Sequence, residues 1–260
     1  INAYCRGTVK PYMEETEIAV QALIDNPNII SEAYLSPLNG TSAEIVDGLP
    51  ASHVTRRCLT MGGYTADESG MEKAIYDGWA QVNLPYAGET ILITGKEAVD
   101  YWKDRGKNAP VSFAVNPVEP RVRLACAKRP DGSFVVDCIS TDGGGIPRNV
   151  IIPAGLALLD LGALTWKEFV KKTSYNPAQM LSLTEKGQLA EGKDADITVI
   201  DTKKREAMMS LVAGDRCMYK GAVVGKGGRI ITTKAGEKAV RDAGLEPVLI
   251  EMEKRTFVRK

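Results

Sequence analysis

Histidine is almost absent from this chain, which has a single one, His53, among 260 residues. The five cysteines are scattered and form no C-x-x-C pair; they are Cys5, Cys58, Cys126, Cys138 and Cys217. A zinc finger needs closely spaced Cys or His ligands, and a disulfide-stabilised scaffold needs a dense, even set of cysteines. Both classes are therefore disfavoured, and we expect reduced thiols in a cytoplasmic protein.

Long apolar runs and an excess of one charge are missing as well. No apolar run approaches the ~20 residues that a membrane-spanning helix needs, and the chain opens on polar and charged residues rather than on a signal peptide. Lys+Arg and Asp+Glu both number 33, so no net charge attracts nucleic acid or an anionic membrane. We therefore expect a globular protein whose partners are neither nucleic acid nor lipid.

Helical and strand-like patterns alternate along much of the chain, which is typical of α/β architecture. Five strands are predicted, at Ile29–Leu35, Thr55–Met61, Trp79–Leu84, Val111–Val115 and Phe134–Ile139. Five helices are predicted, at Glu14–Asp25, Ser69–Tyr76, Gly95–Arg105, Asn149–Leu161 and Thr165–Ser174. The last of these begins with a capping box, because Thr165 is followed three residues later by Glu168.

The segment 188–232 differs from what precedes it, with short strand patterns and many glycines. We interpret it as part of a small β-domain, followed by a charged helix and an extended segment over Ala235–Lys260. Gly225–Gly228, with Lys226 between them, resembles a phosphate-binding loop only in composition. No strand–loop–helix context surrounds it, so a hairpin turn is predicted there.

One strand pattern ends on an acidic residue. The sequence V-V-D-C-I-S-T-D-G-G-G runs from Val135 to Gly145 and places Asp142 at the carboxyl end of the strand. In barrel enzymes this end carries the chemistry, and a carboxylate there can accept and return a proton. Gly143 and Gly144 would let a substrate approach the backbone closely. The alternative is an ordinary helix-capping Asp beside a glycine turn.

A second motif follows, as N-P-A-Q-M-L and then K-G-Q-L-A-E-G-K-D-A-D-I-T-V-I-D. Asn176 and Pro177 suit a helix start, as cap and first helical residue. Gly187 and Gly192 permit turns before a strand at Ile197–Ile200. This order resembles the end of the amidohydrolase superfamily, the metal-dependent deaminases and cyclic amidases. Residues 14–84 resemble most closely its adenine deaminase branch.

The resemblance implies an α/β fold: a (β/α)8 TIM-type barrel joined to a small β-sandwich. Residues 1–186 would be the later portion of the barrel and 187–260 part of the sandwich. Residues 29–142 would then supply roughly five of the eight barrel strands. The first strands would come from elsewhere, so the resemblance implies a second polypeptide, either an N-terminal fragment or a separate subunit.

The ligand set of that family is incomplete here. Its opening H-x-H pair is absent, Leu49 follows V-D-G where a histidine usually stands, and Asp67 replaces the histidine expected before Glu68. The expected strand carboxylate falls on Tyr34, with Glu32 two residues earlier on the same strand face.

Asp142 is the residue that the resemblance nominates most directly, as a metal-contacting group that takes a proton from the attacking water. Further metal ligands would be His53, Asp67 and Glu32, and Arg57 would bind substrate beside Gly143 and Gly144. Zn, Mn and Fe stay open as the divalent metal, although oxygen ligands favour harder ions such as Mn or Mg. Each residue also has an ordinary interpretation: a surface or capping histidine, an exposed acidic loop, and a solvated Arg56-Arg57 pair.

Three functions remain open from the sequence. The first is a chain of a metal-dependent hydrolase that splits a non-peptide C–N bond of a small molecule, completed by another polypeptide. The second is a non-catalytic structural or regulatory subunit that has lost its metal. The third is an unrelated α/β binding protein.

Overall fold

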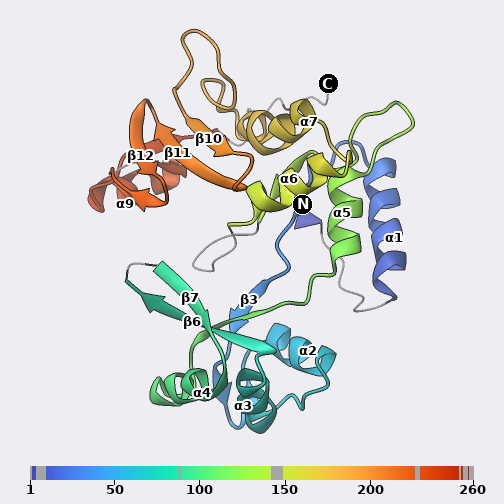
Figure 1. Ribbon diagram of the computed structural model, residues 1–260, viewed down its shortest axis with the longest axis vertical. Coiled ribbons are helices and arrows are strands. Elements are labelled where there is room, and N and C mark those ends of the chain that lie inside the picture. The colour runs from blue at the N-terminus through green and yellow to red at the C-terminus, as the bar shows by residue number, and fades with distance from the viewer. Residues whose placement is uncertain are drawn as a thin grey trace.

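The structure, a computed structural model, describes residues 10–87, 89–141, 149–225, 229–251, 253 and 257, together with the backbone of residues 2–3. A parallel sheet with its helices, an antiparallel sheet with its own helices, and a C-terminal β-meander can be followed in Figure 1. No helix in the described part of the chain is long and apolar enough to cross a membrane.

The parallel sheet has three strands in the order β1 (Asn2–Ala3), β2 (Glu32–Tyr34) and β9 (Cys138–Ser140). Helices α1 (Tyr12–Asp25) and α5 (Val118–Cys126) pack beside it. Ala33 shares a buried cluster with side chains from both helices, Val20 and Leu124. Because strand side chains alternate between faces, the neighbours Glu32 and Tyr34 point away from that cluster.

Between β2 and β9 the chain forms a second unit, not further barrel strands. Its sheet is antiparallel, with the order β3 (Asn39–Ser42), β8 (Pro110–Phe113), β6 (Ala80–Tyr86) and β7 (Glu89–Ile93). A short hairpin, β4 (Ile45–Val46) and β5 (Leu49–Pro50), precedes the helices α2 (His53–Met61), α3 (Glu68–Tyr76) and α4 (Gly95–Asp104). The prediction of about five barrel strands within 29–142 is therefore wrong: among the described residues of this range, only β2 and β9 join the parallel sheet.

The strand predicted at Thr55–Met61 is also wrong, because this segment is helix α2. Ser52 caps the helix by accepting a hydrogen bond from the Thr55 backbone N–H (3.3 Å). Thr55, Cys58 and Leu59 are buried, which is the i, i+3, i+4 spacing of one helical face. This spacing is that of a helix and not of a strand.

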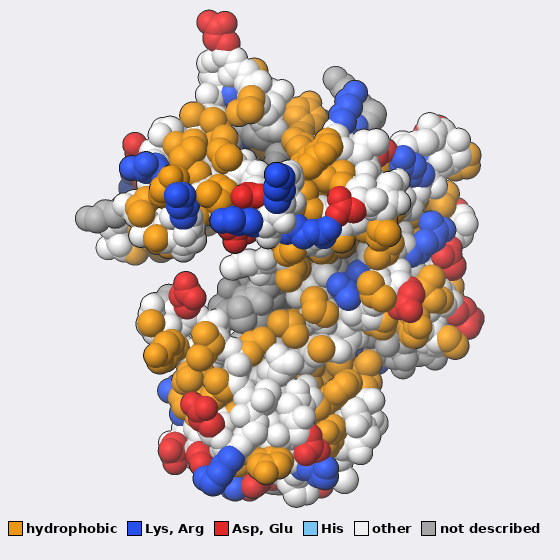
Figure 2. Space-filling view, in the orientation of Figure 1, with side chains coloured by type: hydrophobic (Ala, Val, Ile, Leu, Met, Phe, Trp, Pro, Cys, Tyr) orange, Lys and Arg blue, Asp and Glu red, His pale blue; other side chains and the backbone are white. Residues whose placement is uncertain are grey.

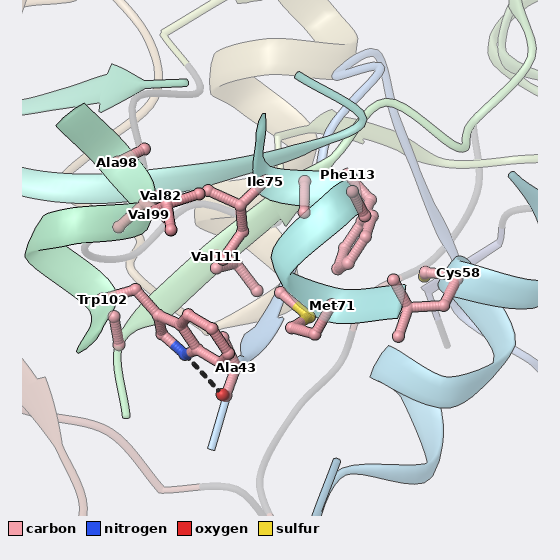
Figure 3. Packing of buried hydrophobic residues seen from close by; sticks show 14 of the residues in the cluster. Ala43, Cys58, Met71, Ile75, Val82, Ala98, Val99, Trp102, Val111 and Phe113 are labelled. Carbon is pink, nitrogen blue, oxygen red and sulfur yellow. Dashed lines mark hydrogen bonds between the residues drawn. The ribbon is translucent and has the colours of Figure 1, made fainter. Parts of the chain in front are cut away.

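The antiparallel unit has its own hydrophobic core (Figure 3). Side chains of α3 and α4 meet the sheet there, and the labelled residues include Met71, Ile75, Val82 and Phe113. Trp102 is fully buried, and its indole N–H donates to the Ala43 carbonyl oxygen at 2.9 Å. A buried indole needs such a partner, so this bond fixes the orientation of the largest core side chain.

After β9, four helical segments follow: α6 (Ile151–Asp160), α7 (Trp166–Val170), the π-helix η1 (Lys171–Tyr175) and α8 (Asn176–Met180). The capping box of Thr165 and Glu168 is confirmed. The prediction that Asn176 caps a helix is wrong, because η1 runs directly into α8. The Asn176 side-chain amide instead donates to the Asp137 carbonyl oxygen at 2.7 Å.

The C-terminal part begins with an antiparallel meander of β10 (Ile197–Asp201), β11 (Glu206–Val212), β12 (Asp215–Tyr219) and β13 (Ala222–Val223). The strand β14 (Ile230–Thr232) pairs in parallel with β15 (Pro247–Leu249), and between them lie η2 (Lys234–Gly236) and α9 (Glu237–Asp242). The helix predicted after 235 is thus present but short. The hairpin turn predicted at Gly225–Gly228 lies mostly outside the described residues, and a domain boundary at 187 stays a prediction.

The K-G-Q-L-A-E-G-K-D-A-D motif joins α8 to the meander. The Lys186 ammonium pairs with Asp194 (2.7 Å) and with Asp196, and Asp196 in turn accepts from the Ala213 backbone N–H at 2.8 Å. Gly187 has a φ of +84°, and a Cβ there would lie 2.7 Å from both the Ala178 Cβ and the Ser174 carbonyl oxygen. Only glycine fits this close approach to the helix.

Replacing Gly187 with alanine should therefore destabilise the fold more than the same change at Gly192. Gly192 has a φ of +79°, but a Cβ at this position would meet nothing within 4 Å, so Gly192→Ala should cost only the left-handed backbone penalty, about 1 kcal/mol. Gly187→Ala adds a steric cost of about 1–3 kcal/mol. Urea unfolding of both variants measures the difference, and equal free energies of unfolding would contradict the close packing.

Candidate functional site

The candidate site lies at the carboxyl ends of β2 and β9. Tyr34 and Ser140 are partners in register, and pairing continues beyond them because the Leu35 N–H donates to the Ser140 carbonyl oxygen at 3.0 Å. Asp142 follows two residues later; it lies outside the described residues, as do Gly143 and Gly144. The strand that leads to Asp142 is therefore placed, whereas the positions of these three predicted site residues are not.

The face of β2 and β9 that carries Tyr34 and Ser140 is polar at this end. Tyr34 is 1% exposed, and the buried Ser140 hydroxyl has no hydrogen-bond partner among the described atoms. Ile139 points the other way, into a cluster with Leu35 and Leu158. A buried hydroxyl without a partner is uncommon, and it marks this strand end as a place to look for a ligand.

The segment by which the chain leaves β2 and the segment by which it returns to α5 are held together by hydrogen bonds from two side chains, Asn116 and Arg121. We call these two residues the clamp. The Asn116 amide donates to the carbonyl oxygens of Ser36 and Leu38, both at 3.1 Å. The Arg121 guanidinium donates to Leu35 (2.5 Å) and to Asn116 (3.1 Å). Burial lowers the pKa of Arg121 from its ordinary value. The clamp fixes the antiparallel unit at the carboxyl end of β2.

The surface is hollowed between the antiparallel unit and the C-terminal meander (Figure 2). In Figure 1 the β6–β7 hairpin reaches toward this hollow from one side, and β10–β12 lie on the other. The connection that follows β2 leads directly into β3 of the antiparallel unit.

Among the described residues, the structure does not bring the predicted metal ligands Glu32, His53 and Asp67 together. Glu32 lies at the amino end of β2, on the same face as Tyr34 as predicted, with Cys138 as its register partner. His53 is exposed at the first turn of α2, in the antiparallel unit. Over the described residues, no group of three or more His, Cys, Asp or Glu side chains could hold a metal ion.

Asp67 is occupied as the N-cap of α3. Its carboxylate accepts from the Gly70 N–H (2.8 Å), the Ser69 hydroxyl (2.8 Å) and the Thr65 hydroxyl (2.9 Å). These bonds, led by the one from Gly70, lower the pKa of Asp67. Arg57 is exposed on α2, so His53, Arg57 and Asp67 all lie in the antiparallel unit, apart from the strand that leads to Asp142.

A buried lysine, Lys172, is the ionisable group that sequence reasoning missed. It is 0% exposed on the π-helix η1; its ammonium donates to the Val136 carbonyl oxygen and lies 3.9 Å from the centroid of the Phe134 ring. Desolvation lowers the pKa of Lys172 to about 8. Nothing in K-K-T-S-Y marks the second lysine as buried, because a charged residue on a helix is normally exposed.

Lys172 lies at the amino end of β9, opposite the carboxyl end that leads to Asp142. Burial raises the pKa of the neighbouring Cys126 thiol, and that of Cys138 to about 12, so both are protonated core thiols. Lys172 and Asn176 are four residues apart and donate to the consecutive carbonyls of Val136 and Asp137. We conclude that this group fastens η1 to the strand and is structural.

The burial of Lys172 makes stability depend on pH. The folded state releases the proton near pH 8 and the unfolded state near 10.5, so between these values the unfolded state binds more protons and the free energy of unfolding rises with pH. We expect wild type to gain ~3 kcal/mol over this window relative to Lys172→Met. Urea unfolding at several pH values tests this. Lys171→Met, the matched control, should keep the wild-type slope; loss of the slope there would contradict the assignment.

Comparison with known proteins adds to this geometry. Residues 122–230, which include β9 and the motif that joins α8 to the meander, match the Amidohydrolase family. A dihydroorotase from Trichlorobacter lovleyi is 30% identical over 215 residues, which are 75% of this chain and 48% of that protein. An N-acetylglucosamine-6-phosphate deacetylase from Lysinibacillus sphaericus is 60% identical over 37 residues, 14% of this chain and 10% of that protein. The chain thus spans about half, or less, of the length of these relatives.

A solved structure of D-aminoacylase, described for its binuclear metal center, has a similar fold. Its TM-score with this chain is 0.52 at 14% sequence identity, and the match covers 87% of this chain and 48% of that one. At this identity the likeness shows the fold alone. The chain therefore contains an amidohydrolase-family segment within a fold that resembles about half of D-aminoacylase.

Proposed function

We propose that this chain is the later part of a metal-dependent amidohydrolase that hydrolyses a non-peptide C–N bond of a small molecule. The observation that carries the proposal is the parallel pairing of β2 with β9, which ends just before Asp142 inside the segment that matches the family. Parallel strands of such folds present their catalytic groups at this end. The family match over 122–230 also disfavours the third hypothesis, an unrelated α/β protein.

Asp142 is the proposed catalytic carboxylate, which accepts a proton and returns it to the leaving nitrogen. Gly143 and Gly144 would leave room for substrate beside it. The described side chains do not make a metal site by themselves, so a divalent ion (Zn, Mn or Fe) would need Asp142 together with ligands from outside the described residues. The substrate would be a nucleobase amine or a cyclic amide; the likeness of residues 14–84 to adenine deaminases and a cytoplasmic location remain part of the proposal.

We further propose that a second polypeptide completes the barrel. The match to the Trichlorobacter lovleyi dihydroorotase covers 48% of that protein, and the parallel sheet has three described strands where a closed barrel has eight. An open sheet edge is a site of unwanted strand pairing. Either an N-terminal fragment of the same precursor or a separate subunit would cover the outer edges of β1 and β9.

Asp142→Asn should abolish hydrolysis in the completed protein while leaving the fold intact. Loss of the proton acceptor should lower kcat by about 10²–10⁴-fold on a cyclic amide such as dihydrouracil. Asp104→Asn, an exposed change at the end of α4, is the matched control and should retain wild-type activity. Full activity in Asp142→Asn, or no metal by elemental analysis with and without any copurifying chain, would refute the catalytic proposal.

Native gel filtration tests the second polypeptide. We expect the chain to elute with a partner, as a species well above its own mass of 28.1 kDa, and to separate from that partner only under denaturing conditions. Mass spectrometry of the copurifying polypeptide then identifies it as an N-terminal fragment or another subunit. A stable, solitary 28.1 kDa species would contradict the proposal.

A non-catalytic subunit is the second candidate, and two observations favour it. Asp67 occupies the position of an expected histidine ligand, but its carboxylate caps α3. His53 is exposed and lies in the antiparallel unit, apart from β9. A protein of this kind would keep the partner but bind no metal. Elemental analysis of the intact complex therefore separates the two candidates.

A further inference from the structure

The strand β7 forms an open edge of the antiparallel sheet. The sheet order is β3, β8, β6 and β7, so among the described strands β7 pairs with β6 alone. Its sequence, E-T-I-L-I, has a single charge, at Glu89, and no proline, and its register with β6 runs without a bulge. Proteins normally place charges, proline or bulges on an open edge to prevent further pairing. β7 is therefore suited to pair with another strand.

The register with β6 shows which backbone groups of β7 face the open edge. Residue pairs of an antiparallel ladder alternate between pairs that exchange two hydrogen bonds and pairs that exchange none. Pro85 has no N–H and is the register partner of Thr90, so these two residues form a pair of the second kind. Because the alternation has a period of two residues, the N–H and C=O groups of Thr90 and Leu92 point away from β6.

The apolar row of the sheet core also reaches this edge. Ile93 lies opposite the fully buried Val82 and packs against the core cluster. Ile91 lies two residues earlier on the same face, but it is 37% exposed. Hydrophobic side chains gather over the β6–β7 hairpin in Figure 2. An apolar side chain placed beside Ile91 would extend this row.

We infer that β7 pairs antiparallel with β7 of a second copy of this chain, about a two-fold axis beside Ile91. In this register Thr90 of each copy lies opposite Leu92 of the other, so their outward N–H and C=O groups form four hydrogen bonds. The two Ile91 side chains meet at the axis in a pair without hydrogen bonds, where opposite side chains approach most closely. Glu89 lies opposite Ile93 of the other copy, so the two carboxylates stay apart.

The symmetry of the edge is the reason to expect a second copy and not another protein. The outward groups of Thr90 and Leu92 are arranged evenly on the two sides of Ile91, so the edge is complementary to itself, as a two-fold interface requires.

This pairing does not depend on the proposed hydrolase function or on the completing polypeptide. That polypeptide would cover the outer edges of β1 and β9 in the parallel sheet, whereas β7 belongs to the antiparallel unit. The native assembly would then hold two copies of this chain.

The number of copies in the native assembly is measured by light scattering on the gel-filtration peak at micromolar concentration, with its composition read from a denaturing gel. We expect two copies of this chain in wild type. Ile91→Lys and Ile91→Glu should each give one copy, because like charges would meet at the axis, and mixing the two variants should restore two. One copy in wild type, two copies in either single variant, or no restoration on mixing would overturn the inference.

Cysteine cross-linking tests the register. Opposite Cα atoms in a pair without hydrogen bonds lie about 4.5 Å apart, within the range of a disulfide. Oxidised Ile91→Cys should therefore run as a covalent dimer on a non-reducing denaturing gel. Thr90→Cys is the matched control, because the two Thr90 Cα atoms would lie roughly 8 Å apart, and it should show only the background of the native cysteines. Equal cross-linking of both variants would contradict the register.

A variant that keeps the fold guards against misfolding. Thr90→Pro removes an outward N–H and leaves the ladder with β6 intact, so it should unfold in urea like wild type yet give one copy. Tyr76→Lys, a change at a 62% exposed residue of α3, should keep two copies. Two copies in a Thr90→Pro protein as stable as wild type would refute the inference.

The composition of the peak separates this inference from the proposed function. One copy of this chain together with a copurifying polypeptide would refute the β7 pairing alone. Two copies with no other polypeptide would refute the completing polypeptide and leave the β7 pairing standing.

Discussion

The pairing of β2 with β9 is the interaction on which the rest of this molecule depends. The two strands are joined at their start by the Asp137 carboxylate, which accepts the Ser31 backbone N–H at 3.0 Å across 106 residues of sequence. The residues between β2 and β9, which include the antiparallel unit, form a long connection between two neighbouring strands of one parallel sheet. If this pairing were lost, the strand that leads to Asp142 and the connection to β3 would separate.

The two ends of β9 have different roles. At its amino end Lys172 and Asn176 hold the helical segment through backbone carbonyls, and the perturbed pKa values there arise from burial in a structural contact. At its carboxyl end lies the Ser140 hydroxyl, which has no hydrogen-bond partner among the described atoms, and Asp142 follows two residues later in the sequence. Ionisable groups with shifted pKa values often mark active sites. In this chain the position of a residue along the strand indicates the catalytic end better than a shifted pKa does. The reason is that the catalytic groups of parallel α/β folds lie at the carboxyl ends of their strands.

The motif within the segment that matches the Amidohydrolase family also has a structural explanation in its own right. Asn176 donates to the strand, Gly187 permits close approach to the helix, and Lys186 bridges two aspartates before β10. Each of these residues stabilises the fold, a role that requires no contact with a substrate. Such a motif therefore indicates a shared architecture more firmly than a shared reaction, and the proposed chemistry depends on the strand end.

Local pattern alone determined the α/β class, most helices, the Thr165 capping box and the strand that ends before Asp142, because periodicity and caps depend on near neighbours. It could not show that residues 39–113 form an antiparallel unit, since strand direction is set by distant partners. Nor could it show that Asp67 caps a helix or that Lys172 and Asn83 are buried. Those features arise only when segments far apart in sequence pack together, so the tertiary structure decided them.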